Sequence, residues 1–322
     1  MTPQEFRDIV YGFQTSRILL TSLELEIFTV INDGAKSSED VSKVISSDIK
    51  ATDRLMNALC ALNFLEKSDG KFSNTNFTSK FLVKGKPDYI SNLMHAVNLW
   101  DSWSSLTSIV RDGKGTSKVT SGSKNWLENF IEAMHYRALK QVPGDIDMLD
   151  LTNVHSVLDF GGGSGAYSIG FVRAKKDIAA VVFDLSDVVP LTQKYISNAG
   201  LQDKIKTVKG NYLLDDLGSG YDLIFLSAIV HSNSFDENKK LIRKCADALN
   251  EGGQIVIQDY AMNEERTLPA SGAFFALNML VNTQGGDTYT EKEIYSWLLN
   301  AGLKNIKRNE TTHGAAQIIG RK

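Results

Sequence analysis

Residues 157–167 read Val-Leu-Asp-Phe-Gly-Gly-Gly-Ser-Gly-Ala-Tyr, and this stretch decides the fold. The apolar run His155–Phe160 in front of the glycines is typical of a buried strand, and the residues after them have helical spacing. Gly161, Gly163 and Gly165 can adopt positive φ, and they let backbone N–H groups approach a ligand closely. The order strand, glycine turn, helix therefore predicts a nucleotide-binding loop.

Two acidic residues accompany this turn. Asp159 stands two residues before the first glycine, and Asp184 ends the next apolar run, Ile178–Phe183. In a doubly wound sheet, the carboxylate that accepts both hydroxyls of a bound ribose follows the turn by about 20 residues. Together with the turn, the two acids predict an adenosine-containing ligand.

The composition fits a chain with two hydrophobic cores, because 42% of its 322 residues are hydrophobic. A net charge of −3 gives no overall attraction for nucleic acid. We find no signal peptide and no apolar run of the roughly 18–20 residues that cross a membrane, and we expect free thiols at Cys60 and Cys245. A cytoplasmic protein is therefore predicted. The five histidines lack the spacing of metal ligands, so no metal is predicted.

Residues 1–88 are predicted to form a winged-helix domain. Helices are expected at 2–19, 21–31, 37–45 and 53–62, followed by a hairpin at 64–73. In a DNA-binding regulator the helix 53–62 would enter the major groove and carry several basic residues, but only Arg54 is there. The first two helices are more apolar than a domain of this size needs. We therefore expect a dimerisation domain, with a ligand-sensing DNA-binding regulator as a remote alternative.

Residues 89–145 are expected to form a helical linker. Its helices are predicted at 89–110 and 126–139, on either side of a Gly/Ser/Lys-rich stretch at 112–124, and Pro143-Gly144 marks the boundary with the next domain. Most of the large apolar side chains here are expected in the core. Three are candidates for the wall of a pocket for an aromatic substrate: Trp100, Phe130 and Met134.

Over residues 146–322, strands and helices alternate, which predicts a doubly wound α/β domain. Strands are expected at 155–160, 178–184, 205–209, 223–227 and 254–259. Helices are expected at 166–175, 187–199, 235–249, 268–283 and 294–300. The last two strands, 304–308 and 316–320, are joined by a turn too short for a crossover helix, so they must pair antiparallel. The expected sheet is mostly parallel and seven-stranded, with a terminal antiparallel hairpin.

Several motifs in this order resemble those of the S-adenosylmethionine-dependent O-methyltransferases, the group that includes plant caffeic acid and animal hydroxyindole O-methyltransferases and bacterial small-molecule enzymes. The motifs are Leu158-Asp-Phe-Gly-Gly-Gly-Ser-Gly165, Phe183-Asp-Leu185, Gly210-Asn-Tyr212, Ala228-Ile-Val-His231, Leu249–Gly253 and Gly285-Gly-Asp-Thr-Tyr-Thr290. The likeness covers essentially the whole chain, because the family also has an N-terminal winged-helix dimerisation domain. It implies S-adenosylmethionine as cofactor, S-adenosylhomocysteine as product, and a homodimer.

The resemblance also assigns the cofactor residues. Gly161 and Gly163 would hold the amino-acid end, and Asp184 would bind the ribose. Asn211 stands where an Asp is usual, and its amide oxygen can still accept from the adenine amino group. Ser227 stands where some members have Lys. The full set implied for the cofactor is Asp159, Gly161, Gly163, Asp184, Leu185, Asn211, Tyr212 and Ser227, with Leu185 and Tyr212 against the adenine.

His231 matches the general base of the family. It follows the apolar strand 223–227 on the side of the sheet where such folds hold ligands. A phenol titrates near pH 10 and histidine near 6.5, so an imidazole can take the proton as methyl transfer proceeds. Asp259 matches one of two acids that direct the histidine, shortened from the usual Glu, while Ser232 replaces a usual Asp.

The second of those acids falls at Thr288, which cannot do that job, and its neighbour Asp287 is expected to point elsewhere. By the same matching, Met134, Met279 and Thr283 line the acceptor pocket. The predicted activity is methyl transfer to a hydroxyl of an aromatic or polyketide-like small molecule. Because the acids around His231 are altered, methylation of carbon or nitrogen, or a relative that transfers no methyl group, stays open.

Overall fold

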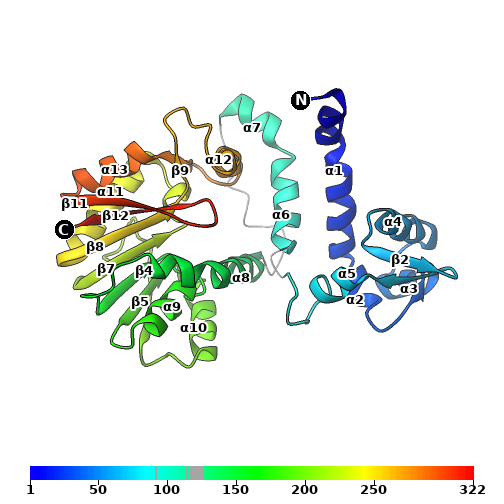
Figure 1. The fold of residues 1–322 in the computed structure, drawn as a ribbon, viewed down its shortest axis with the longest axis horizontal. Helices are drawn as coiled ribbons and strands as arrows, with labels where there is room; N and C mark the ends of the chain where they lie inside the picture. The colour runs from blue at the N-terminus through cyan, green and yellow to red at the C-terminus, as the bar shows by residue number, and fades with distance from the viewer. Residues whose placement is uncertain (91–92, 114, 116–125) are drawn as a thin grey trace. The chain divides into compact units, whose positions relative to one another are not determined.

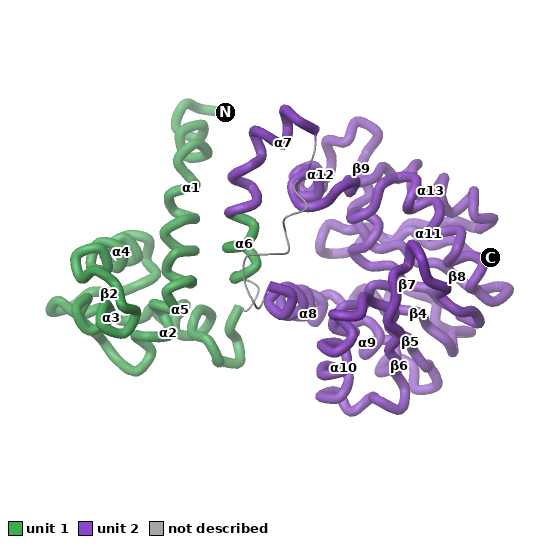
Figure 2. The backbone as a smooth tube through the Cα atoms, turned by 180° about the vertical axis from the view of Figure 1, so that it is seen from behind, with its two compact units in different colours: residues 1–100 green, residues 101–322 purple. Residues whose placement is uncertain are grey.

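A computed structural model describes residues 1–90, 93–113, 115 and 126–322 of the chain. The described chain divides into two compact units, residues 1–100 and 101–322 (Figure 2). Most of the predicted Gly/Ser/Lys-rich stretch at 112–124 lies outside the described residues. The two units are treated separately below.

The first unit has the predicted winged-helix arrangement. Its helices are α1 (Pro3–Glu24), α2 (Ile27–Val30), α3 (Ser38–Ile45), α4 (Ile49–Ala61) and α5 (Asn76–Phe81), and α6 (Leu93–Trp103) begins in it. The predicted hairpin is confirmed as β2 (Leu65–Ser68) and β3 (Lys71–Asn74), and β1 (Lys36–Ser37) adds an unpredicted third antiparallel strand. Thr2 caps α1 with the expected capping box.

Two predicted helix boundaries in this unit are wrong. The helix expected to begin at residue 53 begins at Ile49, where the Asp48 side chain caps it. The break expected near residue 20 falls at Glu26, whose φ of 51° is left-handed, so α1 continues to Glu24. Leu20 and Leu23 are buried in the core of the unit, which favours extending the helix to them. The first half of α1 instead exposes an apolar stripe, defined here as Phe6, Ile9, Val10 and Phe13.

The second unit contains the predicted seven-stranded sheet (Figure 1). Its strands lie in the order β11-β12-β8-β7-β4-β5-β6. Five are parallel: β4 (Ser156–Phe160), β5 (Ala179–Asp184), β6 (Ile205–Lys209), β7 (Tyr221–Ser227) and β8 (Leu249–Asp259). The last two, β11 (Lys304–Glu310) and β12 (Ala316–Arg321), form the expected antiparallel hairpin, with β12 against β8.

Helices cover both faces of this sheet. One hydrophobic cluster joins a sheet face to α8 (Trp126–Asp147), α9 (Ala166–Ala174) and α10 (Val189–Asn198). The other joins the opposite face to α11 (Phe235–Ala248) and α13 (Glu291–Asn300), as Figure 1 shows. The nearly continuous apolar strands follow from this, because a parallel sheet is buried on both sides.

Three helical predictions in this unit need correction. The helix expected to end at Leu139 continues to Asp147, through Pro143, since Val142 and Ile146 are buried against α9. The segment expected as one helix over 89–110 is split into α6 and α7 (Leu106–Asp112). The helix expected over 268–283 is α12 (Ala270–Asn282). A two-stranded parallel pair, β9 (Ala261–Met262) with β10 (Tyr289–Thr290), was not predicted.

A buried polar hub lies at the end of α8. The Asp145 carboxylate, 3% exposed, accepts hydrogen bonds from the Tyr167 hydroxyl at 2.7 Å and from the Gln258 amide at 2.9 Å. Nε2 of His313, in the turn of the last hairpin, lies 3.0 Å from the same carboxylate, and Gln317 donates to the Asp145 carbonyl at 2.8 Å. These bonds satisfy a carboxylate that burial would otherwise penalise.

Candidate functional site

The candidate site lies where two neighbouring parallel strands end. From β4 the chain runs to its neighbour β5 and then to β6, on one side of β4. It later crosses to β7, on the other side of β4, so β4 and β7 flank the topological switch point of the sheet. The carboxyl ends of the strands at such a point form the ligand crevice of an open α/β sheet. The glycine turn follows β4, and the 3₁₀ turn Val230–Ser232, which carries His231, follows β7.

The glycine turn has the backbone that its sequence predicts. Gly161, Gly163 and Gly165 have φ of 62°, 56° and 75°. A Cβ on Gly161 would lie 2.2 Å from the Ile229 side chain, and a Cβ on Gly162 would lie 2.6 Å from the Asp159 carboxyl carbon. Gly161 and Gly162 therefore cannot be replaced by larger residues unless the Ile229 and Asp159 side chains move.

Asp159 lies beneath this turn and is 1% exposed. Its Oδ2 accepts hydrogen bonds from the Ser168 backbone at 3.1 Å and from the Ser168 hydroxyl at 2.8 Å. Burial raises the pKa of Asp159 to about 6, the Ser168 bonds oppose that rise, and the nearby Asp184 adds to it. Asp159 thus supports the turn from below. Because its charged form is disfavoured by burial, it lowers the free energy of unfolding at neutral pH.

We expect Asp159→Asn to stabilise the fold at pH 8. Because burial raises the folded-state pKa from 3.8 to about 6, this carboxyl stabilises the fold below pH 4, and that contribution is lost as the pH rises through 6. The loss spans roughly two pH units at about 1.4 kcal/mol each, so an amide that keeps the Ser168 bonds should raise the free energy of unfolding by up to about 3 kcal/mol. Urea unfolding at pH 8 and pH 4 measures this gain. A larger gain at pH 4 than at pH 8 would contradict it.

Asp184 stands at the end of β5, beside the turn. Its two carboxylate oxygens accept hydrogen bonds from the backbone N–H groups of Gly163, at 2.8 Å, and Leu185, at 2.7 Å. Burial raises the pKa of Asp184, and these two bonds oppose the rise. The carboxylate is therefore fixed against the turn, and Leu185 beside it is 52% exposed.

The remaining predicted cofactor residues lie after β6 and β7. Asn211 is exposed, and its amide oxygen accepts from the Leu213 N–H at 3.0 Å. Tyr212 is half-buried, with its ring edge against Phe160 and its hydroxyl donating to Asn233. Ser227 ends β7, where the Gln258 amide, a member of the polar hub, donates to it at 3.2 Å. Their roles toward a cofactor stay predictions.

The structure brings the two predicted catalytic residues together. Nδ1 of His231 lies 2.9 Å from both carboxylate oxygens of Asp259, and the two side chains are 12% and 4% exposed. The His231 backbone N–H also donates to this carboxylate, at 3.3 Å. Because Nδ1 is engaged, the proton sits on that nitrogen in the neutral ring, and Nε2 is the atom that can accept a proton.

Sequence reasoning missed an aromatic group around this imidazole. The ring of Phe275, on α12, meets the His231 ring edge-on with centroids 4.7 Å apart, and the Tyr260 ring lies 5.1 Å from that of Phe275. Phe275 stands four residues before the predicted pocket residue Met279, on the same side of the helix, and this spacing could have identified it.

The second acid that the family places near the histidine falls at Thr288 in this chain. The Thr288 hydroxyl is buried and donates to the Gly272 carbonyl at 3.3 Å. The Asp287 carboxylate contacts Arg266 at 3.1 Å and accepts from the Thr288 N–H at 2.8 Å. Neither group is bonded to the imidazole of His231, in agreement with the expectation for Asp287. No pattern in the sequence indicated Arg266 as a residue of this site.

The predicted pocket residues lie on several helices. Met279 is buried on α12, and its carbonyl accepts from the Thr283 hydroxyl at 2.7 Å. On α8, Met134 is half-buried and Phe130 stacks on Trp126, with centroids 5.3 Å apart. Trp100 belongs to the first unit, where it packs against the core. Whether these five side chains line one acceptor pocket stays a prediction.

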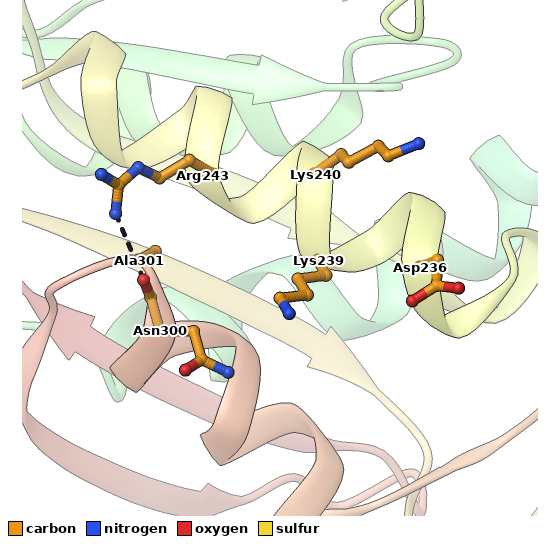
Figure 3. Close-up of a pocket in the computed structure, with 6 residues that line it drawn as sticks. All are labelled: Asp236, Lys239, Lys240, Arg243, Asn300 and Ala301. Atoms are coloured by element: carbon orange, nitrogen blue, oxygen red, sulfur yellow. Dashed lines mark hydrogen bonds between the residues drawn. The ribbon is translucent and has the colours of Figure 1, made fainter.

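One surface cavity of about 570 Å³ is not part of this site. It lies between α11 and α13 (Figure 3) and is lined by Asp236, Lys239, Lys240, Arg243, Asn300 and Ala301. A second cavity of about 300 Å³ lies between α8 and α10. Its lining residue Ile131 also approaches the glycine turn, 3.6 Å from where a Cβ of Gly163 would stand.

The described residues also bear on a metal site and on a membrane-spanning helix. No three or more side chains of His, Cys, Asp or Glu come together there in a way that could hold a metal ion. None of the helices in that part of the chain combines the length and the apolar character needed to cross a membrane.

Comparison with known proteins agrees with this architecture. Residues 103–304 match the O-methyltransferase domain family, and residues 8–84 match the O-methyltransferase dimerisation domain family. The chain is 28% identical over 313 residues to the 3-hydroxy-5-methyl-1-naphthoate 3-O-methyltransferase of Streptomyces sahachiroi, covering 95% of this chain and 90% of that one. It is 24% identical to the S-adenosyl-L-methionine-dependent methyl transferase PigF of a Serratia species, covering 100% and 97%.

Solved structures share the fold. The structure of PigF with SAH superposes with a TM-score of 0.91 over 100% of both chains, at 23% identity. Human N-acetylserotonin methyltransferase in complex with SAM gives 0.84 at 22% identity, over 99% of this chain and 97% of that one. The α/β sheet, the glycine turn and the two family matches thus define a methyltransferase. The chain belongs to the O-methyltransferase family, whose methyl donor is S-adenosylmethionine.

Proposed function

We propose that this protein moves a methyl group from S-adenosylmethionine to a hydroxyl of an aromatic or polyketide-like small molecule, with His231 as general base. The observation that supports this most is the pair formed by His231 and Asp259. The carboxylate engages Nδ1 and leaves Nε2 to accept the proton of an acceptor hydroxyl. Such a base contributes about 10²–10⁴ in rate.

The residues around the glycine turn fit the cofactor. S-adenosylmethionine supplies an electrophilic methyl group on a sulfonium. The Asp184 carboxylate, already fixed at the turn, is placed to exchange its bonds with Gly163 and Leu185 for the two ribose hydroxyls. The exposed Leu185 offers an apolar surface to the adenine. By the family resemblance, the turn at Gly161 and Gly163 would hold the amino-acid end.

An aromatic acceptor suits the surroundings of His231. Phe275 and Tyr260 give the imidazole aromatic neighbours, and aromatic rings recognise other rings by offset or edge-on contact. The names of two relatives point the same way, since one acts on a hydroxynaphthoate and another on N-acetylserotonin. We therefore expect an acceptor with a hydroxyl on, or conjugated to, an aromatic ring.

The test is a mass change. The protein is incubated with S-adenosylmethionine and a panel of hydroxynaphthoates, hydroxyindoles and polyketide-like phenols, together with matched aromatic amines. We expect a gain of about 14 mass units on a phenol, and the O-methyl shift in its carbon spectrum identifies the methylated atom. Turnover of the amines alone would favour N-methylation, and formation of no methylated product with any acceptor class would argue against the proposal.

We further propose a homodimer through the first unit. The apolar stripe on α1 is exposed in the single chain, with Ile9 68% and Phe13 53% exposed, and contiguous apolar surface of this kind marks an interaction site. The match to a dimerisation domain over residues 8–84 supports a second copy as the partner.

Charge placed on the stripe should therefore break the dimer. We expect Ile9→Lys combined with Phe13→Lys to give a monomer by light scattering, because burying two ammonium groups in an apolar interface costs several kcal/mol. Gln4→Lys combined with Thr15→Lys is the matched control, since both residues are exposed on the opposite side of α1. A dimer that survives the first pair would place the interface elsewhere.

A further inference from the structure

Arg266 joins three groups of a neighbouring segment. It lies in the loop between β9 and α12, with a left-handed φ of 55°. Its Nη1 contacts Asp287 at 3.1 Å and donates to the Thr288 carbonyl at 2.6 Å. Its Nη2 lies 2.6 and 2.7 Å from the two carboxylate oxygens of Glu293, which forms the capping box of α13 with the N-cap Thr290. The planar fork of an arginine is suited to such multiple contacts.

The segment held by Arg266 packs directly on the backbone of His231. The Asp287 N–H donates to the His231 carbonyl at 3.0 Å. A Cβ on Gly286 would lie 2.4 Å from the same carbonyl oxygen, so only glycine allows this approach. The Gly286 N–H is bonded to the Thr283 hydroxyl at 2.8 Å, which ties the segment to the end of α12.

Asp287 is thus close to His231 along the backbone, but its carboxylate is engaged by Arg266. This matters for a base, because a second carboxylate beside an imidazole favours the charged ring. A ring that already carries its second proton cannot accept one from an acceptor hydroxyl. Keeping the second carboxylate away leaves Asp259 as the carboxylate that contacts the ring.

We propose that Arg266 is a positioning residue of the site: it holds the Asp287 carboxylate away from His231 and fixes the segment 285–288 on the His231 backbone, so that Asp259 alone directs the ring. The inference rests on the proposed role of His231. Arg266 acts through Asp287 and does not itself touch the imidazole in the described contacts.

Among the described residues, the elements packed against this imidazole carry the following charged groups. β8 contributes Asp259, and the segment 285–288 contributes Asp287. α12 has no charged residue along its length and contributes the Phe275 ring. Arg266 and Glu293 are the next charges outward, through Asp287 and Thr288. A change in the protonation of the ring can therefore be traced to one of these groups.

The test follows the ring of His231 by NMR in full-length protein labelled at its histidine rings, with His231→Asn to assign the signal. We expect Arg266→Gln to move the titration midpoint of the ring up by about 0.5–1 pH unit, because Asp287 is released toward it. Adding Asp287→Asn to that variant should return the midpoint to the value of Asp287→Asn alone. Arg266→Lys, which keeps one charge but loses the fork, should give an intermediate shift.

Lys292→Gln is the matched control for the loss of one positive charge. Lys292 is exposed and pairs with Glu264, and it does not contact Asp287 in the described part of the chain, so its removal should leave the midpoint unchanged. An unshifted midpoint in folded Arg266→Gln and Arg266→Lys overturns the inference. So does a shift that persists in the double variant, because it would come from the lost arginine charge and not from Asp287.

A kinetic measurement separates this inference from the proposed function. In Arg266→Gln, the acid limb of kcat should move up by about 0.5–1 pH unit, which lowers kcat about three- to tenfold on that limb, while KM for the cofactor stays unchanged. If His231→Ala retains full activity, the base assignment fails, whereas the NMR titration still tests Arg266. If His231→Ala is inactive but Arg266→Gln shows neither the titration shift nor the kinetic shift, only the positioning role fails.

Discussion

His231→Ala is expected to lower kcat by about 10²–10⁴ at pH 7–8 and to leave cofactor affinity within about threefold of the native value. The reason is geometric. The Asp259 carboxylate fixes Nδ1 at 2.9 Å, so Nε2 is the proton acceptor, and alanine removes it. The measurement is steady-state methyl transfer by mass spectrometry, with S-adenosylhomocysteine binding by calorimetry on the same sample.

Asp259→Asn is the companion variant for this prediction. The amide cannot balance the charge of a protonated imidazole, so kcat should fall as well, by less than in His231→Ala, because Nε2 remains in place. A loss below about tenfold in His231→Ala would contradict the general-base role. It would indicate that holding the acceptor near the methyl group is sufficient for the reaction.

Asp184→Ala is expected to weaken S-adenosylhomocysteine binding by about 10²–10⁴. Two hydrogen bonds from ribose hydroxyls to a carboxylate contribute about 1.5–3 kcal/mol each, and alanine removes both. The change also leaves the Gly163 and Leu185 N–H groups without their present acceptor. Titration calorimetry with S-adenosylhomocysteine measures the loss directly and needs no acceptor substrate.

Asp159→Asn serves as the matched control for Asp184. It removes one carboxylate beside the same turn, but Asp159 is buried beneath the glycines and its carboxylate is bonded to Ser168. Its affinity should stay within about tenfold of the native protein. Equal losses in the two variants would mean that the charge near the turn, and not the ribose contact, controls binding.

The sequence predicted the sheet well because its signals are local. The apolar runs of the five parallel strands are each bounded by turn residues, and the glycine turn has one backbone that suits it. The short connection between the last strands left antiparallel pairing as the only solution, and the register of β11 with β12 confirms it. The helix breaks near Glu26 and between α6 and α7 were missed, since helical periodicity continues across both.

In the candidate site, too, some residues could be predicted from the sequence and others could not. His231 and Asp259 could be predicted to meet, because each follows the end of a neighbouring parallel strand. Phe275 could have been selected from its spacing to Met279, but Arg266 could not be selected from the sequence, because its importance depends on tertiary contacts. The direction of the Asp287 carboxylate is set by a guanidinium 21 positions earlier in the chain, and no local pattern records that pairing.

The hub at Asp145 has a consequence for the far end of the polypeptide. A carboxylate on α8 is satisfied in part by side chains from the final hairpin, His313 and Gln317, and α8 also runs beside the glycine turn. Trimming the last dozen residues would strip donors from an anion sealed inside the protein. The final hairpin therefore supports the ligand-binding half from inside, and truncations that remove it act on the interior of the molecule.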